Sequence, residues 1–203
     1  MNPETRRQLW RGWGLCERHA WGFLSVEAAF RHGWMPGPAV LYEDLMSRAL
    51  RAVRFGHLLR GWPLPVTLRE KGPCLMCEAG FGPDSPGFAA PALVARGRDP
   101  SQLRSLARTT RPFWEPAVCG RCAGTGAVPR CRRHLVADIW HGVAGDLALH
   151  RSLVSDIRSR LVRYARSFRF EYRGTATGED MGALIAAVGW CSGWRPILGI
   201  DGE

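Results

Sequence analysis

The chain has 203 residues, of which 46% are hydrophobic, and it carries a formal net charge of +10. This hydrophobic fraction is enough for a buried core, which excludes a disordered tail. Since no charged-then-apolar signal segment opens the chain and no apolar run could span a bilayer, we expect a cytoplasmic protein without a membrane span.

The positive charge indicates an acidic partner, such as a nucleic acid, an acidic protein or an anionic membrane surface. Lys71 is the single lysine among the 28 basic residues. An excess of arginine together with abundant Gly, Ala and Pro is also what a high-GC genome encodes. The charge alone therefore does not separate phosphate binding from biased coding.

Helical periodicity dominates the first part of the chain. A short helix is predicted over residues 1–12, and a second begins at Cys16 and continues through Phe30 with apolar residues at helical spacing. A third is predicted over residues 39–59, with Pro38 near its first turn. Within it, the adjacent Glu43 and Asp44 point about 100° apart, so we expect solvated or arginine-paired acids rather than a catalytic pair. Residues 61–73 are expected to be irregular.

The second part begins with a stretch rich in Gly and Pro over residues 80–100, the best candidate linker. A short helix follows, with Asp99 as N-cap and Pro100 at its first position. A long helix is predicted between Asp146 and Tyr172, and a last one after the N-cap Thr177. Cys191 lies in the apolar run of this last helix and is expected to be a buried core residue.

These patterns predict a mainly α protein whose helical halves are stapled by two Cys/His metal sites. The predicted parts are an N-terminal helical Cys/His half at 1–79, a Gly/Pro-rich linker with a short helix at 80–112, and a C-terminal metal knuckle and helical half at 113–203.

Six of the seven cysteines occur in Cys-x-x-Cys or Cys-x-x-His pairs, a spacing typical of metal ligands. The four pairs are Cys16/His19, Cys74/Cys77, Cys119/Cys122 and Cys131/His134. Because short loops cost less entropy to close, we expect the last two pairs to share one site and the first two to share the other. An interleaved arrangement, and an all-cysteine site beside a Cys2His2 site, stay open because this penalty grows only logarithmically with loop length.

Three thiolates and one imidazole suit tetrahedral Zn²⁺, so two zinc sites are predicted, and a complete four-ligand shell is typical of structural zinc. An iron–sulfur cluster is the alternative cofactor. Asp138 lies four residues after His134 on the same helical face, so it either accepts a hydrogen bond from a ligating imidazole or is a surface acid. His141 is expected at the rim of the site. Three further histidines form no constellation, namely His32, His57 and His150.

Five arginines cluster on the predicted 146–172 helix, opposite its apolar face. They are Arg151, Arg158, Arg166, Arg169 and Arg173. An exposed helical face must be polar in any case, so a solvated face is one interpretation and an anion-binding face in contact with phosphate is the other.

Residues 119–126, with the sequence Cys-Gly-Arg-Cys-Ala-Gly-Thr-Gly, resemble one zinc-knuckle repeat of the J-domain co-chaperones. Only one copy is present and no J-domain precedes it within these residues. The resemblance therefore implies a zinc knuckle and not a chaperone role.

A broader resemblance covers residues 8–50 and, more loosely, 72–203. It rests on Gly-Leu-Cys-Glu-Arg-His-Ala-Trp at 14–21, Ala-Val-Leu-Tyr-Glu-Asp-Leu at 39–45, Cys-Leu-Met-Cys at 74–77, and a late Cys-x-x-His followed by a long helix. These features resemble an uncharacterised bacterial family that alternates Cys-x-x-Cys and Cys-x-x-His pairs on a helical scaffold. The resemblance implies helices and metal binding, but no activity. The chain departs from the alternation, because no Cys-x-x-Cys precedes Cys16 and an extra one begins at Cys119.

Three function classes follow from these observations. The first is a zinc-binding scaffold or binding module whose arginine face, with surface tryptophans, contacts a nucleic acid or an acidic protein. The second is an iron–sulfur redox protein or enzyme accessory. The third is a metalloenzyme in which one site lacks a protein ligand and holds an open coordination position.

Overall fold

The computed structural model describes residues 3–31, 34–58, 64–82, 89–143 and 146–199. Within these ranges the regular elements are helices, and no strand is present, so the mainly α fold class is confirmed. The helices are α1 (Pro3–Arg11), α2 (Glu17–Arg31), α3 (Pro36–Leu58), α4 (Leu64–Leu68), α5 (Leu75–Glu78), α6 (Pro91–Arg98), α7 (Ser101–Thr109), α8 (Arg111–Trp114), η1 (Glu115–Ala117), α9 (Arg132–Trp140), α10 (Leu147–Arg166), η2 (Phe170–Tyr172), α11 (Gly178–Ser192) and α12 (Arg195–Leu198).

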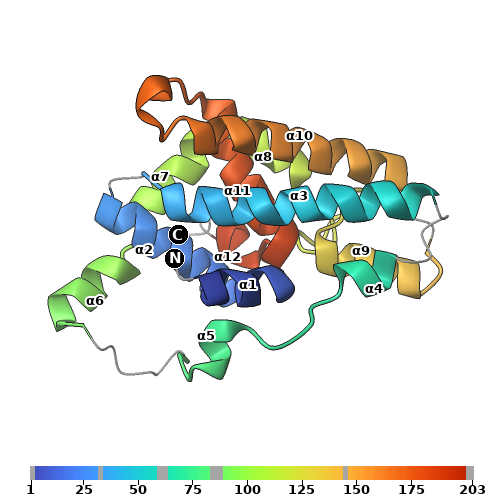
Figure 1. Cartoon of the computed structure of the whole chain (residues 1–203), viewed down its shortest axis with the longest axis horizontal. Coiled ribbons are helices and arrows are strands. Elements are labelled where there is room, and N and C mark those ends of the chain that lie inside the picture. Colours follow the sequence, from blue (N-terminus) through green and yellow to red (C-terminus); the bar gives the residue numbers. More distant parts are fainter. Residues whose placement is uncertain (1–2, 32–33, 59–63, 83–88, 144–145, 200–203) are drawn as a thin grey trace.

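The two longest helices, α3 and α10, lie side by side and run in opposite directions (Figure 1). The central helix is α11, which packs against both and is buried continuously from Gly182 to Ser192. A helix that is apolar on all sides must be surrounded by other elements, which explains this position. Its start agrees with the sequence prediction, because the Thr177 side chain caps the helix and Asp180 completes a capping box.

The core is one connected cluster that draws on both ends of the chain. Leu24 and Leu45 belong to the same buried cluster as Leu161 and Ile185. Leu103 and Ala107, from the predicted linker, are buried in it as well. The three-part division of the sequence stays a prediction, and the core extends across its boundaries.

Several elements differ from the sequence predictions. The helix predicted to reach Tyr172 ends at Arg166, where the Ser167 hydroxyl donates to the Tyr164 carbonyl at 2.7 Å. A helical turn, α4, occupies part of the stretch expected to be irregular, because Leu64 and Leu68 are buried.

The Gly/Pro-rich stretch also contains a helix, α6, with Pro91 in its first turn. It packs against α2, where Arg96 donates to the Ala29 carbonyl at 3.1 Å and lies 4.7 Å from the Phe30 ring centroid.

Other expectations are confirmed. Cys191 is buried in the core beside Met46. Asp44 pairs with Arg6, as expected for an arginine-paired acid. Within the described residues, none of the helices is both long and apolar enough to cross a bilayer.

Candidate metal centres

The structure gathers the eight predicted ligands into two groups of four. We call Cys16, His19, Cys74 and Cys77 the α2–α5 site, and Cys119, Cys122, Cys131 and His134 the knuckle site. In each group the sulfur atoms and one imidazole nitrogen all lie within 4.8 Å of one another. All seven cysteines lie in the described residues and are free thiols, so no cystine links these groups. This grouping is the arrangement expected from the sequence, in which the first two pairs share one site and the last two share the other.

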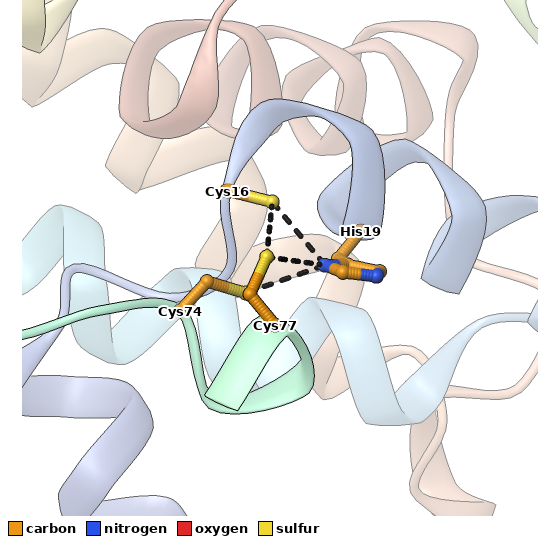
Figure 2. Close-up of side chains that lie close together, drawn as sticks. All are labelled: Cys16, His19, Cys74 and Cys77. Atoms are coloured by element: carbon orange, nitrogen blue, oxygen red, sulfur yellow. Dashed lines mark hydrogen bonds between the residues drawn. The ribbon is translucent and has the colours of Figure 1, made fainter. Parts of the chain in front are cut away.

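The α2–α5 site joins the start of α2 to the short helix α5 (Figure 2). Cys16 immediately precedes α2, and its carbonyl accepts the helical hydrogen bond of Ala20 at 2.8 Å. Cys74 is the N-cap of α5 and Cys77 lies one turn further. A helix start directs free amides toward the sulfur atoms, which favours the thiolate that binds metal.

Distances within the α2–α5 site are those of a compact cluster. His19 Nδ1 lies 3.2 Å from Cys16 Sγ, 3.5 Å from Cys74 Sγ and 3.4 Å from Cys77 Sγ. Cys16 Sγ and Cys77 Sγ are 3.8 Å apart. The imidazole nitrogen thus faces all three sulfur atoms, as Figure 2 shows.

The other imidazole nitrogen of His19 is oriented by the backbone. Nε2 lies 2.8 Å from the Phe81 carbonyl oxygen, which also accepts from Arg18 at 2.9 Å. Arg18 Nη2, which can only donate, also lies 3.0 Å from Nε2, so this nitrogen has both a donor and an acceptor beside it. With Nδ1 as the metal ligand, Nε2 would hold the proton and donate to the Phe81 carbonyl. The same kind of contact orients metal-ligating histidines in general.

The pKa values of the site's cysteines diverge. Burial raises the pKa of the Cys16 thiol to about 11. Burial acts in the same direction on Cys74, but hydrogen bonds from the backbone amides of Cys16, Cys77 and Met76 outweigh it and lower the pKa of Cys74 to about 7. Of these two thiols, Cys74 is the one whose surroundings favour the thiolate form.

The knuckle site is built on a tight turn followed by the start of α9. The Gly120 amide donates to the Pro129 carbonyl at 3.0 Å and the Ala123 amide to the Cys119 carbonyl at 3.0 Å. A Cβ on Gly120 would lie 2.1 Å from the Ala127 carbonyl oxygen, so this position requires glycine. Gly124 has a φ of 68°, which also favours glycine.

Distances within the knuckle site match those of the first site. His134 Nδ1 lies 3.2 Å from Cys119 Sγ and 3.4 Å from both Cys122 Sγ and Cys131 Sγ. Cys122 Sγ and Cys131 Sγ are 3.9 Å apart. Cys119 and Cys131 are buried, whereas Cys77 of the α2–α5 site is exposed.

The three thiols of the knuckle site shift one another's pKa values. Hydrogen bonds from the thiols of Cys122 and Cys131 lower the pKa of Cys119. The same interactions with Cys119 raise the pKa of Cys122 and of Cys131. The three sulfur atoms are thus close enough to compete for protons, as ligands of a single cation must be.

Asp138 supports the knuckle through arginines. Its carboxylate is buried, with one oxygen 2.7 Å from Arg130 Nε and the other 2.6 Å from Arg121 Nη2. The sequence prediction paired Asp138 with the His134 imidazole or left it as a surface acid. In the structure it pairs with both Arg121, which lies between Cys119 and Cys122, and Arg130, which directly precedes Cys131.

Two residues that sequence reasoning did not assign also hold the knuckle. His150 is buried, and its Nε2 accepts from the Arg130 amide at 3.1 Å while Nδ1 lies 2.7 Å from the Asp146 carbonyl. Arg132 is buried and donates to the carbonyls of Cys191 and Leu68, at 3.0 Å and 2.6 Å. Neither role has a local sequence signal, because both depend on residues brought together by the fold.

The junction of α11 and α12, residues 191–195, contacts both sites. The Arg195 amide donates to Glu17, next to Cys16, at 2.9 Å, and the Ser192 hydroxyl donates to the Leu15 carbonyl at 3.0 Å. On the other side, Arg132, next to the knuckle ligand Cys131, donates to the Cys191 carbonyl at 3.0 Å. The two sites are therefore fixed to the same junction at the end of the central helix.

A cavity of ≈ 320 Å³ adjoins the knuckle site. The ligand residues Cys122, Cys131 and His134 line it, together with three charged residues, Glu17, Arg133 and Arg195. His141 is exposed at the C-terminal end of α9, whereas the knuckle ligand Cys131 lies at its start, and its place at the rim of the site stays a prediction. His32 and the side chain of His57 lie outside the described residues.

The five predicted anion-binding arginines do not form one helical face. Arg151 is exposed on α10, but Arg158 is partly buried and donates to the Ser47 hydroxyl at 2.8 Å, which connects α10 to α3. Arg166 is the last residue of α10, and Arg169 and Arg173 flank η2 beyond it. Of these five arginines, Arg166, Arg169 and Arg173 lie near one another, at the end of α10 and around η2.

A scan against protein-family models finds no match, and searches of curated proteins and of solved structures find none either. The resemblances to the J-domain knuckle and to a bacterial Cys/His family therefore have no support beyond the residues that carry them.

Proposed function

We propose that this chain is a zinc-stapled helical binding module for an acidic partner. The two Cys3His groups hold one structural Zn²⁺ each, and the helical scaffold that they stabilise presents the binding surface. The ligands are Cys16, His19, Cys74 and Cys77 in the α2–α5 site and Cys119, Cys122, Cys131 and His134 in the knuckle site.

The observation that carries the proposal is the size of each ligand group. Zn–S bonds of about 2.3 Å and Zn–N bonds of about 2.0–2.1 Å, arranged tetrahedrally, separate two sulfur atoms by about 3.8 Å and sulfur from nitrogen by about 3.5 Å. The corresponding distances are 3.8 and 3.9 Å between sulfur atoms and 3.2–3.5 Å from sulfur to nitrogen. Both groups have the dimensions of a shell around one ion.

The same dimensions favour zinc over the iron–sulfur alternative. A cluster places its protein ligands on different iron atoms and spreads them further apart than a single ion does. All four ligand atoms in each group lie within 4.8 Å of one another.

The complete set of four protein ligands likewise favours a structural role over a metalloenzyme. Catalytic zinc sites usually have three protein ligands and keep the fourth position for water or substrate. The cavity beside the knuckle site borders ligand residues, but an enzyme would have to release one of them to open a position on the metal.

Metal analysis of the purified chain tests this proposal. We expect a colourless protein with about two zinc ions per chain by elemental mass spectrometry. Cys77→Ser and Cys122→Ser should each reduce the zinc content to about one. Cys191→Ala is the matched control and should leave it unchanged, because the Cys191 sulfur contacts Met46 in the core and belongs to neither ligand group. Iron with visible absorption, or no bound metal, would contradict the proposal.

A further inference from the structure

The end of α10, the turn after it and Trp34, just before α3, form a surface that combines aromatic rings and arginines. We call it the aromatic–arginine patch, and its residues are Trp34, Arg166, Arg169, Phe170, Tyr172 and Arg173. Phe170 is 83% exposed and Trp34 is 45% exposed. Arg166, Arg169 and Arg173 are exposed as well. Large apolar side chains that share an exposed surface with arginines are typical of a binding site.

The guanidinium groups of the patch lie close to its rings. The Arg166 guanidinium carbon is 3.8 Å from the Tyr172 ring centroid, and Arg166 also donates to the Tyr172 hydroxyl. The Arg173 guanidinium carbon is 5.6 Å from the Trp34 centroid and 5.9 Å from that of Phe170. Arg166 and Arg173 are thus within cation–π range of rings of the patch.

A series of contacts between aromatic rings connects the patch to the core. Trp34 packs on Phe168 with centroids 5.7 Å apart, and Phe168 packs edge-on against the buried Tyr164 at 4.9 Å. A partly buried ring held in this way loses little further conformational freedom when a ligand stacks on it.

The local charge is strongly positive. Residues 166–176 contain three arginines and a single acid, Glu171. The ligand must therefore offer both anionic groups for the arginines and flat apolar groups for the rings.

We infer that the aromatic–arginine patch binds single-stranded nucleic acid, with its bases against Phe170 and Trp34 and its phosphates against Arg169 and Arg173. Sequence-tolerant binders of single strands combine these two elements, a basic track for the backbone and aromatic side chains on which bases stack. The inference deepens the proposed function, since it rests on that function for an acidic partner and identifies its chemical class.

Other acidic partners use less of this surface. The bases of a duplex are already stacked within it, so a duplex offers phosphates alone to the patch. An acidic protein segment would pair with the arginines but has no general use for the exposed faces of Phe170 and Trp34. A membrane surface favours a continuous apolar face, whereas here guanidinium groups lie among the rings.

The test uses the full zinc-loaded chain and fluorescence anisotropy. The probes are a labelled oligouridine and a labelled oligothymidine of about twenty nucleotides, a labelled duplex of the same length, and phosphatidylserine–phosphatidylcholine vesicles measured by co-sedimentation. We expect a single strand to bind at least about tenfold more tightly than the duplex, with binding that weakens as salt rises.

Paired variants locate the site. Phe170→Ala removes an exposed ring and should weaken single-strand binding about tenfold, whereas Trp140→Ala, which removes another exposed aromatic at the end of α9, should not. Arg169→Ala should weaken binding several-fold and Arg151→Ala, elsewhere on α10, should not. Circular dichroism and zinc content should be the same for all four variants.

Several outcomes would overturn the inference. They are equal binding of duplex and single strand, binding to vesicles alone, equal loss in the control variants, and no binding by a chain that holds two zinc ions. The last result would leave the zinc proposal standing. Single-strand binding by a chain without zinc would instead support the patch and contradict the structural-metal proposal.

Discussion

The two candidate metal centres contain the same short sequence motif and differ in where the fold places it. Both contain a Cys-x-Arg-His segment whose cysteine directly precedes a helix: Cys16–His19 at the start of α2 and Cys131–His134 at the start of α9. In the knuckle site the second cysteine pair is nearby in sequence, and Cys119 and Cys131 are 0% and 2% exposed. In the α2–α5 site it comes from α5 at the edge of the molecule, and Cys77 is exposed (Figure 1).

This difference in burial indicates that the same set of ligands would stabilise a different part of the molecule at each site. Cys119 and Cys131 of the knuckle belong to the core cluster, so a metal there would support the packing of α9 and α11. Residues 69–82 are mostly exposed, and Cys74, Leu75, Met76 and Phe81 are the partly buried ones among them. A metal in the α2–α5 site therefore tethers a peripheral segment to a core that is already formed.

The largest expected effect is the loss of a knuckle ligand. Cys119→Ser should lower the free energy of unfolding by at least about 3 kcal/mol, because the zinc binding energy is part of the folding energy and the residue is buried. Denaturant unfolding and soluble yield measure this. An unfolding curve that matches the unsubstituted chain would break the distinction between the two sites.

The next effect concerns the knuckle turn. Gly120→Ala places a Cβ 2.1 Å from the Ala127 carbonyl oxygen, and we expect a loss of about 2–3 kcal/mol together with weaker zinc binding. Gly126→Ala is the matched control, since a Cβ there meets no atom within 4 Å. Equal stability of the two variants, measured by thermal unfolding, would show that the turn does not constrain the site.

A smaller effect is expected at the tether. Cys77→Ser should cost about 1–2 kcal/mol and release residues 69–82 while the core stays folded. Trypsin should then cleave faster after the exposed Arg69 and Lys71, with α3 and α10 still protected in hydrogen exchange. Unfolding of the whole chain by this substitution would mean that both metals support the core.

The smallest effect is expected for Arg18, which donates to the Phe81 carbonyl that also contacts His19. Arg18→Ala removes one hydrogen bond at an exposed position and should cost less than about 1 kcal/mol, while zinc binding at the α2–α5 site weakens modestly. Competition with a chromophoric chelator measures it. Arg133→Ala, at the corresponding exposed position of the knuckle site, is the comparison, and an equal loss of zinc there would remove the specific role of Arg18.

Much of the fold follows from local patterns in the chain. Apolar periodicity predicts α2, α3, α10 and α11, and two-residue spacing identifies the eight candidate ligands, which the structure brings together. The early end of α10 was not predicted, because apolar spacing continues through Phe168 although the helix ends at Arg166.

The residues that support the sites were harder to identify from sequence. Arg158 fits an exposed helical face by its spacing, yet it bonds to Ser47 on a helix more than one hundred residues earlier. His150 and Arg132 likewise acquire their roles from partners on other elements. Such roles depend on tertiary packing, which the spacing of residues along one helix does not encode.

The buried position of α11 has a consequence for synthesis. Ribosomes release α1 through α10 before residues 178–192 emerge, so during translation the earlier helices have no central element to pack around. The knuckle ligands all emerge before that point and could already capture an ion on the nascent chain. Completion of the core must wait for α11, and until then the apolar faces of α3 and α10 are open to chaperones and to aggregation.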